Sequence, residues 1–293
     1  MLLSKIKNYF ENNFYKKFNF PKKEILYVDN NENMNLLIRD LSKSEIIGID
    51  TEFDWRKTYY PKLSLLQMAI GKKIYIVDCI SKINLSSLKK FLEDPKKLIV
   101  FHSSRSDITV LKTNLNIKLN NLFDIQIAEK FINGGEIKNY GFIVLKYFGY
   151  KLDKSETNSN WLKRPLTVKQ LNYAAEDVKF LLSIHKKQLK ILKKLNKDKD
   201  LIIEFRKEAK LGNQELYISR LKKLRKASKE EKDVFLWREN QAKGKNLPPS
   251  YIFEDKFLKE ITQKIKNKKR ESEEIIRFFK DNSSARDFLK YIK

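Results

Sequence analysis

Short runs of aliphatic residues between residues 25 and 104 are the feature that most constrains the fold of this chain. Each run is rich in Ile, Val and Leu, and turn residues or amphipathic segments separate the runs, which is the pattern of buried strands. Several consecutive strands, followed by strands that alternate with helices, predict an α/β domain with a mixed sheet. The predicted strands span 25–30, 44–53, 63–71, 72–80 and 96–104, and the predicted helices span 33–43, 84–94 and 105–115.

The second half of the chain has a different hydrophobic periodicity. From about residue 121 onward, a 3.6-residue apolar period predicts mostly helix, starting with the segment 122–132. Thr167 marks a helix start, and Pro248-Pro249 mark a loop inside a compact helical unit. The predicted organisation is an N-terminal extension (1–24), the α/β domain (25–200), a helical connector (201–227) and a small all-α domain (228–293).

The charge of the chain indicates the kind of partner it binds. The formal net charge is +25 over 293 residues. Because a charge of this size repels itself, we expect an anionic partner that neutralises it. Nucleic acid is the leading candidate, and an anionic membrane surface is the second. The chain is also rich in Lys, Ile and Asn, which AT-rich coding favours, so part of the excess charge has an explanation without any ligand.

The scarcity of cysteine and histidine limits the metal sites that this chain can build. Its single cysteine, Cys79, excludes an intramolecular disulfide and a thiolate zinc cluster, and its only histidines are His102 and His185. Carboxylates must therefore hold any metal, which favours Mg²⁺ or Mn²⁺. No apolar run approaches the roughly 20 residues that span a bilayer. Since the N-terminus also lacks the continuous apolar core of a secretion signal, we expect a cytoplasmic protein with no membrane partner.

Four carboxylates and a tyrosine fall where secondary structure would aim them at one point. Asp50 and Glu52 are two residues apart on a predicted strand, so they share a face. Tyr173 and Asp177 are four residues apart on a predicted helix, so they also share a face. Asp107 follows a strand, at the start of a helix. Carboxylates at the carboxyl ends of strands, and on a helix that crosses them, can converge on one pair of ions.

A pair of divalent ions held in this way suits phosphoryl transfer. Two ions about 3.5–4 Å apart clamp the attacking and leaving oxygens of an in-line displacement. The phenol of Tyr173 could hold the attacking water, but with an ordinary pKa of about 10 it would be a poor base. Each residue alone has a simpler interpretation, such as a helix cap for Asp107 or a solvated helix position for Asp177. Their joint occurrence favours metal-dependent cleavage of a polyanion.

Several segments of the chain resemble ribonuclease D, in the DEDD exonuclease superfamily. They are IIGIDTEFDWRKTYYPKLSLLQMA, FHSSRSDITVL, LFDIQIAEKF, YKLDKSETNSNWLKRPLT and LNYAAEDVKFLL, within roughly residues 45–190. The resemblance implies a ribonuclease H-like mixed-sheet domain that hydrolyses RNA from the 3′ end and releases nucleoside 5′-monophosphates. It also implies that the substrates are tRNA precursors and other structured RNAs, and it implies no obligate protein partner.

The same resemblance implies roles for individual residues. Asp50, Glu52, Asp107 and Asp177 would ligate two divalent ions, Mg²⁺ or Mn²⁺. Tyr173 would orient the attacking water, which places the chain in the tyrosine subclass. The segment VFLWRENQAKGKNLPPSYIFEDKFLKEI is similar to an HRDC domain, a small helical module that binds nucleic acid. Family members with two such domains are known, and this chain has room for one clear copy.

Four further residues are predicted to bind substrate. Phe53 and Tyr60 follow the first acidic pair, where an aromatic ring could stack on a terminal base for about 1–3 kcal/mol. Tyr60 precedes Pro61, so it could instead pack the loop. Lys163 and Arg164 precede the helix of the Tyr-Asp pair, where they could contact phosphates or lie in a solvated loop.

Two other functions stay open at this stage. A 3′-5′ DNA exonuclease would use the same carboxylates, because RNA is distinguished from DNA mainly by its 2′-OH, and no residue for that contact is evident. A non-catalytic nucleic-acid-binding protein on a nuclease fold is the other alternative. The intact set of carboxylates and the tyrosine argues against it.

Overall fold

The computed structural model describes residues 23–266 and 272–292, so the predicted extension at 1–24 lies almost entirely outside the described residues. The chain forms two compact units. The first consists of Met1–Asp54 and Leu63–Asn213, and the second of Trp55–Lys62 and Gln214–Lys293. The boundary between the two units, after Asn213, falls within the predicted connector at 201–227.

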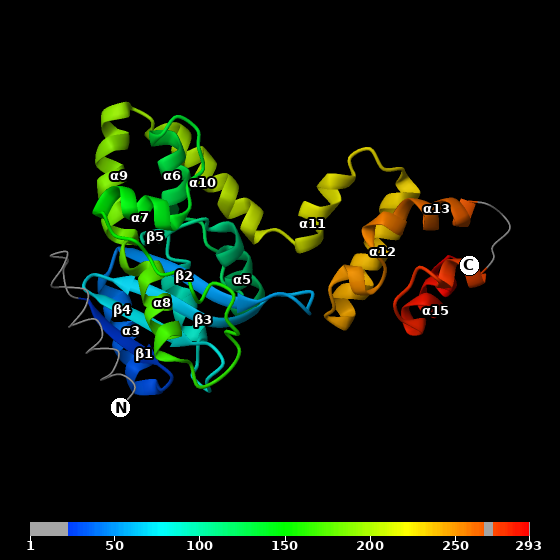
Figure 1. Cartoon of the computed structure of the whole chain (residues 1–293), viewed down its shortest axis with the longest axis horizontal. Helices are drawn as coiled ribbons and strands as arrows, with labels where there is room; N and C mark the ends of the chain where they lie inside the picture. The colour runs from blue at the N-terminus through cyan, green and yellow to red at the C-terminus, as the bar shows by residue number, and fades with distance from the viewer. Residues whose placement is uncertain (1–22, 267–271, 293) are drawn as a thin grey trace. The chain divides into compact units, whose positions relative to one another are not determined.

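A six-stranded mixed sheet forms the centre of the first unit, which confirms the predicted fold class (Figure 1). The strands lie in the order β1-β4-β3-β2-β5-β6. β1 pairs parallel with β4, β3 pairs antiparallel with β4, and β5 pairs parallel with both β2 and β6. The strands are β1 (Glu24–Val28), β2 (Ile46–Asp54), β3 (Lys62–Ile70), β4 (Lys73–Asp78), β5 (Leu98–Phe101) and β6 (Leu122–Asp124).

Strand β6 corrects the sequence analysis, which assigned residues 122–132 to one helix. Its three residues pair with β5, and α6 (Ile125–Ile132) begins only after them. Apolar residues continue from the strand into the helix, so periodicity alone does not reveal the change. Asp124 marks the boundary, because its carboxylate accepts the N–H groups of Gln126 and Ile127 and so caps α6.

Capping residues in the sequence set several helix boundaries. Asn30 caps α3, and Thr167, the predicted helix start, forms a capping box with Gln170 at the start of α8. The segment 84–94 forms only a 3₁₀ turn and one helical turn, shorter than predicted. Further described helices of this unit are α3 (Asn31–Lys43), η1 (Ser86–Leu88), α4 (Lys89–Leu92), α5 (Arg105–Leu115), α7 (Tyr140–Phe148), α8 (Val168–Lys179), α9 (Leu181–Leu195) and α10 (Asp198–Asn213). Within the described ranges, no helix is both long enough and apolar enough to cross a bilayer.

Helices α8 and α9 pack closely on β2. Every residue of β3 and β4 is buried except the first residue of each strand, so the middle of the sheet is covered on both faces. Gly48 of β2 permits the close approach of α9, since a Cβ there would lie 3.2 Å from the Cβ of Leu181 and 3.3 Å from the Cβ of Ala69. Alternate residues of a strand share a face, so these helices cover the face that also carries residues 50 and 52.

From Gln214 onward, the described secondary structure of the second unit is helical, and the unit has its own core. The ring of Trp237 packs edge-on against Phe288, with centroids 4.7 Å apart. Tyr59, from the segment between β2 and β3, belongs to this core and is only 2% exposed. The helices are α11 (Leu216–Leu221), η2 (Lys222–Leu224), α12 (Lys229–Lys245), η3 (Pro249–Tyr251), η4 (Asp255–Phe257), α13 (Leu258–Lys266), α14 (Ser272–Ile276) and α15 (Asn282–Tyr291).

Candidate active site

Asp50, Glu52 and Asp177 form a cluster of three carboxylates. One oxygen from each lies within 4.8 Å of the other two. Asp50 and Glu52 lie on one face of β2, and Asp177 comes from α8, which packs against β2. All three side chains are partly exposed, so an ion can reach them. The structure thus brings together three of the four carboxylates that the sequence indicated.

The fourth carboxylate, Asp107, lies beside this cluster and is more deeply buried. It occupies the first turn of α5 and is 6% exposed. The hydroxyl of Thr51, the residue between the two acidic residues of β2, donates a hydrogen bond to Asp107 Oδ1 at 2.6 Å. This bond ties the start of α5 to the strand that carries the cluster. The sequence analysis did not single out Thr51, whose partner Asp107 lies 56 residues away in the sequence.

Burial and mutual repulsion make the negative charges of the cluster unfavourable. Burial, and then the charge of Asp177, raises the pKa of Asp50 well above its ordinary value. Burial and the charges of the neighbouring carboxylates raise the pKa of Glu52 to about 10. Burial is also the main reason that the pKa of Asp177 rises to about 8 and that the pKa of Asp107 is raised. A divalent cation would offset this repulsion, and a donor set made of carboxylate oxygens suits Mg²⁺ or Mn²⁺. The residues therefore fit a divalent metal ion.

Tyr173 lies one turn before Asp177 on α8. Its hydroxyl is 3.2 Å from Thr157 Oγ1, and its ring lies 5.8 Å from that of Trp161, centroid to centroid. Burial, and then the charge of Asp177, raises the pKa of Tyr173 well above its ordinary value. The phenol therefore keeps its proton and can donate or accept a hydrogen bond, as expected of a residue that holds water rather than one that acts as a base.

Lys154 is a second residue near the site that the sequence analysis did not single out. Its carbonyl oxygen accepts a hydrogen bond from Thr157 Oγ1 at 2.9 Å, and that hydroxyl lies 3.2 Å from the Tyr173 hydroxyl. Its positive charge opposes the effects that raise the pKa of Asp177. Its side chain runs across Gly141 of α7, where a Cβ would lie 3.0 Å from Lys154 Cε. The available signal was its place in the motif YKLDKS, which carried part of the family resemblance. The contact of Lys154 with Gly141 forms only when the chain folds, so the local sequence does not reveal where the Lys154 side chain lies.

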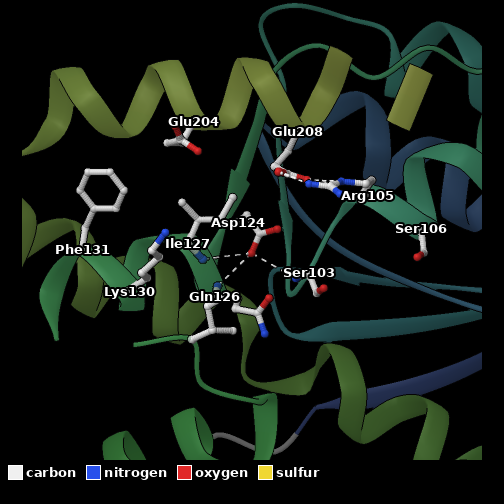
Figure 2. Close-up of a pocket in the computed structure, with 11 residues that line it drawn as sticks. Ser103, Arg105, Ser106, Asp124, Gln126, Ile127, Lys130, Phe131, Glu204 and Glu208 are labelled. Carbon is white, nitrogen blue, oxygen red and sulfur yellow. Dashed lines mark hydrogen bonds and ion pairs between the residues drawn. The ribbon is translucent and has the colours of Figure 1, made fainter. Parts of the chain in front are cut away.

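Asp124 fixes the turn that leads from β5 into α5 (Figure 2). In addition to capping α6, its carboxylate accepts the N–H of Ser103 at 3.1 Å and that of Ser104 at 2.7 Å. Ser103 has a φ of 64°, a backbone conformation that few residues other than glycine adopt. These hydrogen bonds stabilise the turn. Asp124 therefore influences the site by positioning the start of α5, where Asp107 lies.

A pocket of about 370 Å³ lies beside this turn, with α10 along one side (Figure 2). Arg105 of α5 donates two hydrogen bonds to the carboxylate of Glu208 of α10, at 2.8 and 2.6 Å. The lining residues are Ser103, Arg105, Ser106, Asp124, Gln126, Ile127, Lys130, Phe131, Ile137, Glu204 and Glu208. None of the four carboxylates of the candidate site is among them, so this pocket is distinct from that site.

Arg164, one of the predicted phosphate contacts, pairs with Asp78 in the structure. Its Nε and Nη2 donate to the two carboxylate oxygens of Asp78 at 2.7 Å each, and Nη1 donates to the carbonyl oxygen of Trp161 at 2.7 Å. The Tyr27 hydroxyl donates to the same carboxylate at 2.5 Å. Burial acts to raise the pKa of Asp78, but the hydrogen bonds from Arg164 and Tyr27 lower it overall. Arg164 thus ties the segment before α8 to the end of β4.

The other predicted substrate contacts differ in their surroundings. Phe53 is partly buried against the core of the first unit, and Lys163 is exposed. Tyr60 belongs to the second unit, where its backbone N–H donates to Asn246 Oδ1 at 3.2 Å. Contact of these three residues with substrate stays a prediction.

Comparison with known proteins identifies a family and several relatives. The family described as 3′-5′ exonuclease matches residues 25–193. The chain is 30% identical to the ribonuclease D of Desulfotalea psychrophila over 244 residues, which cover 80% of this chain and 65% of that protein. It is 40% identical to the ribonuclease D of Xanthomonas oryzae pv. oryzae over 139 residues, 47% of this chain and 38% of that protein. The chain therefore spans less than two thirds of the length of these curated relatives.

Solved structures share the fold. RNase D from Escherichia coli, described as an exoribonuclease involved in structured RNA processing, superposes with a TM-score of 0.81 at 23% identity and covers 92% of this chain and 73% of that chain. The catalytic core of RRP6 from Trypanosoma brucei gives a TM-score of 0.63 at 20% identity and covers 92% of this chain and 79% of that chain. At these identities the likeness establishes the α/β architecture and leaves the roles of residues to the site itself.

Proposed function

The chain belongs to the 3′-5′ exonuclease family, among relatives of ribonuclease D, and we propose that it is a metal-dependent 3′-5′ exoribonuclease that releases nucleoside 5′-monophosphates. The observation that carries this proposal is the cluster of Asp50, Glu52 and Asp177 within 4.8 Å, with Asp107 beside it. The net charge of +25 supports a polyanionic substrate.

In this proposal the four carboxylates hold two divalent ions, Mg²⁺ or Mn²⁺. Such ions, when bound, lower the pKa of a water molecule and stabilise the leaving 3′ oxygen. The chain contributes the placement of the ligands. β2 fixes Asp50 and Glu52, and the packing of α8 on the sheet fixes Asp177. Thr51 holds Asp107 by a hydrogen bond, as residues behind metal ligands commonly do.

Two neutral or cationic groups complete the proposed site. Tyr173 holds the attacking water through its phenol oxygen, because its raised pKa keeps it from acting as a base at neutral pH. Lys154 places a positive charge near Asp177, where it can attract the phosphate next to the bond that is cleaved. The carboxylates and these two side chains together orient water and phosphate for in-line attack.

We propose that the substrate is RNA with a free 3′ end, including tRNA precursors and other structured RNAs. The names of the curated relatives support RNA over DNA. In the same proposal, the second unit acts as an HRDC-like module that binds the RNA. Its helices α12 and α13, joined through the loop at Pro248-Pro249, carry the segment that resembles such a domain.

A time course on matched RNA and DNA oligonucleotides with unpaired 3′ tails tests this function. Each is incubated with Mg²⁺, Mn²⁺ or EDTA, beside the Asp177→Ala variant. The proposal predicts a metal-dependent ladder that shortens from the 3′ end of RNA and is lost in the variant. Faster cleavage of DNA would identify a DNA exonuclease of the same chemistry. Binding without cleavage in either metal would identify a nucleic-acid-binding protein on a nuclease fold.

A further inference from the structure

Helix α7 exposes two large apolar side chains on one side. Phe142 is 43% exposed and Leu145 is 50% exposed, and residues three apart in a helix lie next to each other. Both line an open groove of about 630 Å³ whose other wall is the segment 151–154. Adjacent apolar side chains with this much exposure mark a binding surface more often than isolated ones do.

Three lysines lie at or beside this groove. The Nζ of Lys138 lies 4.8 Å from the centre of the Phe142 ring and also pairs with Glu136, while Lys151 and Lys154 line the groove together with one acidic residue, Asp153. Much of the Phe142 ring remains exposed. Proteins bind single-stranded nucleic acid with exposed aromatic rings that have cations beside them, because the ring stacks on a base while the cations attract phosphates. A hydrophobic protein partner would not require these lysines beside the ring.

The groove is connected to the candidate active site through the segment that follows it in the chain. Lys154 lines the groove, its carbonyl oxygen accepts a hydrogen bond from Thr157 Oγ1 at 2.9 Å, and the same Thr157 hydroxyl lies 3.2 Å from the hydroxyl of Tyr173. The start of α7 is also attached to the helix of Asp177, because the Tyr140 hydroxyl donates to the carbonyl oxygen of Glu176 at 3.2 Å and accepts from the N–H of Phe180 at 3.3 Å. An RNA strand whose terminal nucleotide occupies the carboxylate cluster therefore has its next nucleotides within reach of this groove.

We propose that the α7 groove binds an unpaired nucleotide just upstream of the one that is cleaved, with Phe142 stacked on its base and Leu145 beside it. This inference rests on the proposed exoribonuclease function and names a substrate site within it. Stacking is tolerant of sequence because every base has a π-face, so the groove requires an unpaired 3′ end rather than a particular base. A paired terminus cannot offer a free base to the ring.

Steady-state cleavage by the full chain tests the groove. The Phe142→Ala variant is compared with wild type on a short unpaired RNA and on the p-nitrophenyl ester of uridine 5′-monophosphate, which has no upstream nucleotide. The KM for RNA should rise by about 5- to 150-fold, the range expected when a base stack is lost, while cleavage of the ester should not change. Phe142→Tyr should behave as wild type because it keeps the ring. Ile203→Ala, which removes a side chain that is 62% exposed on α10, serves as the matched control.

Two kinetic results would overturn the inference. An unchanged KM for RNA in Phe142→Ala would show that Phe142 does not bind the upstream nucleotide. An equal loss of activity on the ester would mean that the substitution damages the catalytic centre. Binding in EDTA of an RNA with 2-aminopurine as the second nucleotide from the 3′ end separates this test from that of the proposed function. Stacking on Phe142 should quench the fluorescence in wild type and not in Phe142→Ala, whether or not the RNA is cleaved. Equal quenching in both proteins would contradict the site.

Discussion

The hydroxyl of Tyr59 donates a hydrogen bond to the carboxylate of Glu239 at 3.1 Å, inside the core of the second unit. Glu239 is 1% exposed, and Arg220 both pairs with it at 3.3 Å and lies over the Tyr59 ring at 5.1 Å. Tyr59 comes from the segment that joins β2, the strand with Asp50 and Glu52, to β3. The helical unit is thus completed by a piece of chain that continues directly from the candidate active site.

Removing the Tyr59 hydroxyl should destabilise the second unit. In Tyr59→Phe the buried Glu239 loses a hydrogen bond, and we expect a loss of about 1–3 kcal/mol in the free energy of unfolding of that unit. Denaturant titration followed by the fluorescence of Trp237, which lies in the same core, measures it. Tyr251→Phe, on a side chain that is 44% exposed, is the control and should change little. Equal stability of Tyr59→Phe and wild type would show that the hydrogen bond contributes nothing.

The pair of Arg164 and Asp78 should make the first unit sensitive to acid. The folded pKa of Asp78 lies below its ordinary value, so the ionised carboxylate stabilises the fold at neutral pH, and that contribution is lost as the pH falls through the folded pKa. Arg164→Met should cost about 3–5 kcal/mol at neutral pH, because it leaves a buried carboxylate without its cation.

Unfolding free energies at neutral and acid pH measure this effect. The deficit of Arg164→Met relative to wild type should shrink as the pH falls through the folded pKa of Asp78, because protonation then removes the ion pair in wild type too. Arg39→Met, whose side chain is 57% exposed, provides the control. A loss of stability in Arg164→Met that is the same at every pH would contradict a stabilising ion pair between Arg164 and Asp78. A selective rise in the KM for RNA would support the phosphate contact that the sequence suggested.

The hydroxyl of Thr51 should be needed for metal affinity. Thr51→Val keeps the shape of the side chain but removes the hydrogen bond to Asp107, so the carboxylate loses its orientation. We expect the metal concentration for half-maximal activity to rise by about 10–100-fold, the usual effect of losing a group behind a metal ligand. Thr51→Ser keeps the hydroxyl and should retain most of the affinity. Identical metal titrations for Thr51→Val and wild type would rule out this role.

Gly48 should tolerate no side chain. In Gly48→Ala the new Cβ would meet the Cβ atoms of Leu181 and Ala69 at 3.2 and 3.3 Å, which pushes α9 away from β2. We expect a loss of about 1–3 kcal/mol in stability and a fall in activity, because α8 and Asp177 precede this contact in the chain. Gly244→Ala on α12 is the matched control. A Cβ there meets nothing within 4 Å, so this change should stabilise its helix by about 0.5–1 kcal/mol. Full activity of Gly48→Ala would show that the helices can shift without cost.

Local sequence predicted those parts of the fold that depend on neighbouring residues. The apolar runs gave the first five strands, Thr167 gave the start of α8, and α5 has the bounds that its amphipathic pattern indicated. The face shared by Asp50 and Glu52 also follows from the period of a strand. Their convergence with Asp177 depended on a family resemblance and on the general rule that ligands gather at strand ends.

Long-range packing decided the parts that were not predicted. Strand β6 exists because residues 122–124 pair with β5, and its apolar side chains look like the first turn of α6. The membership of Tyr59 in the second unit depends on Glu239, 180 residues away in the sequence. Arg164 pairs with Asp78, 86 residues away in the sequence, and the two meet only in the folded chain. No local pattern carries these contacts.

Cleavage of an RNA labelled at its 5′ end by wild type and by Asp50→Asn, each with Mg²⁺ and with Mn²⁺, tests the central claim most directly. The substitution keeps the size of the side chain and removes one negative charge from the carboxylate cluster. We expect wild type to shorten the RNA stepwise from its 3′ end and to release nucleoside 5′-monophosphates. Asp50→Asn should bind the RNA nearly as well but should not cleave it. Unchanged cleavage by Asp50→Asn would show that the cluster of Asp50, Glu52 and Asp177 is not the catalytic centre.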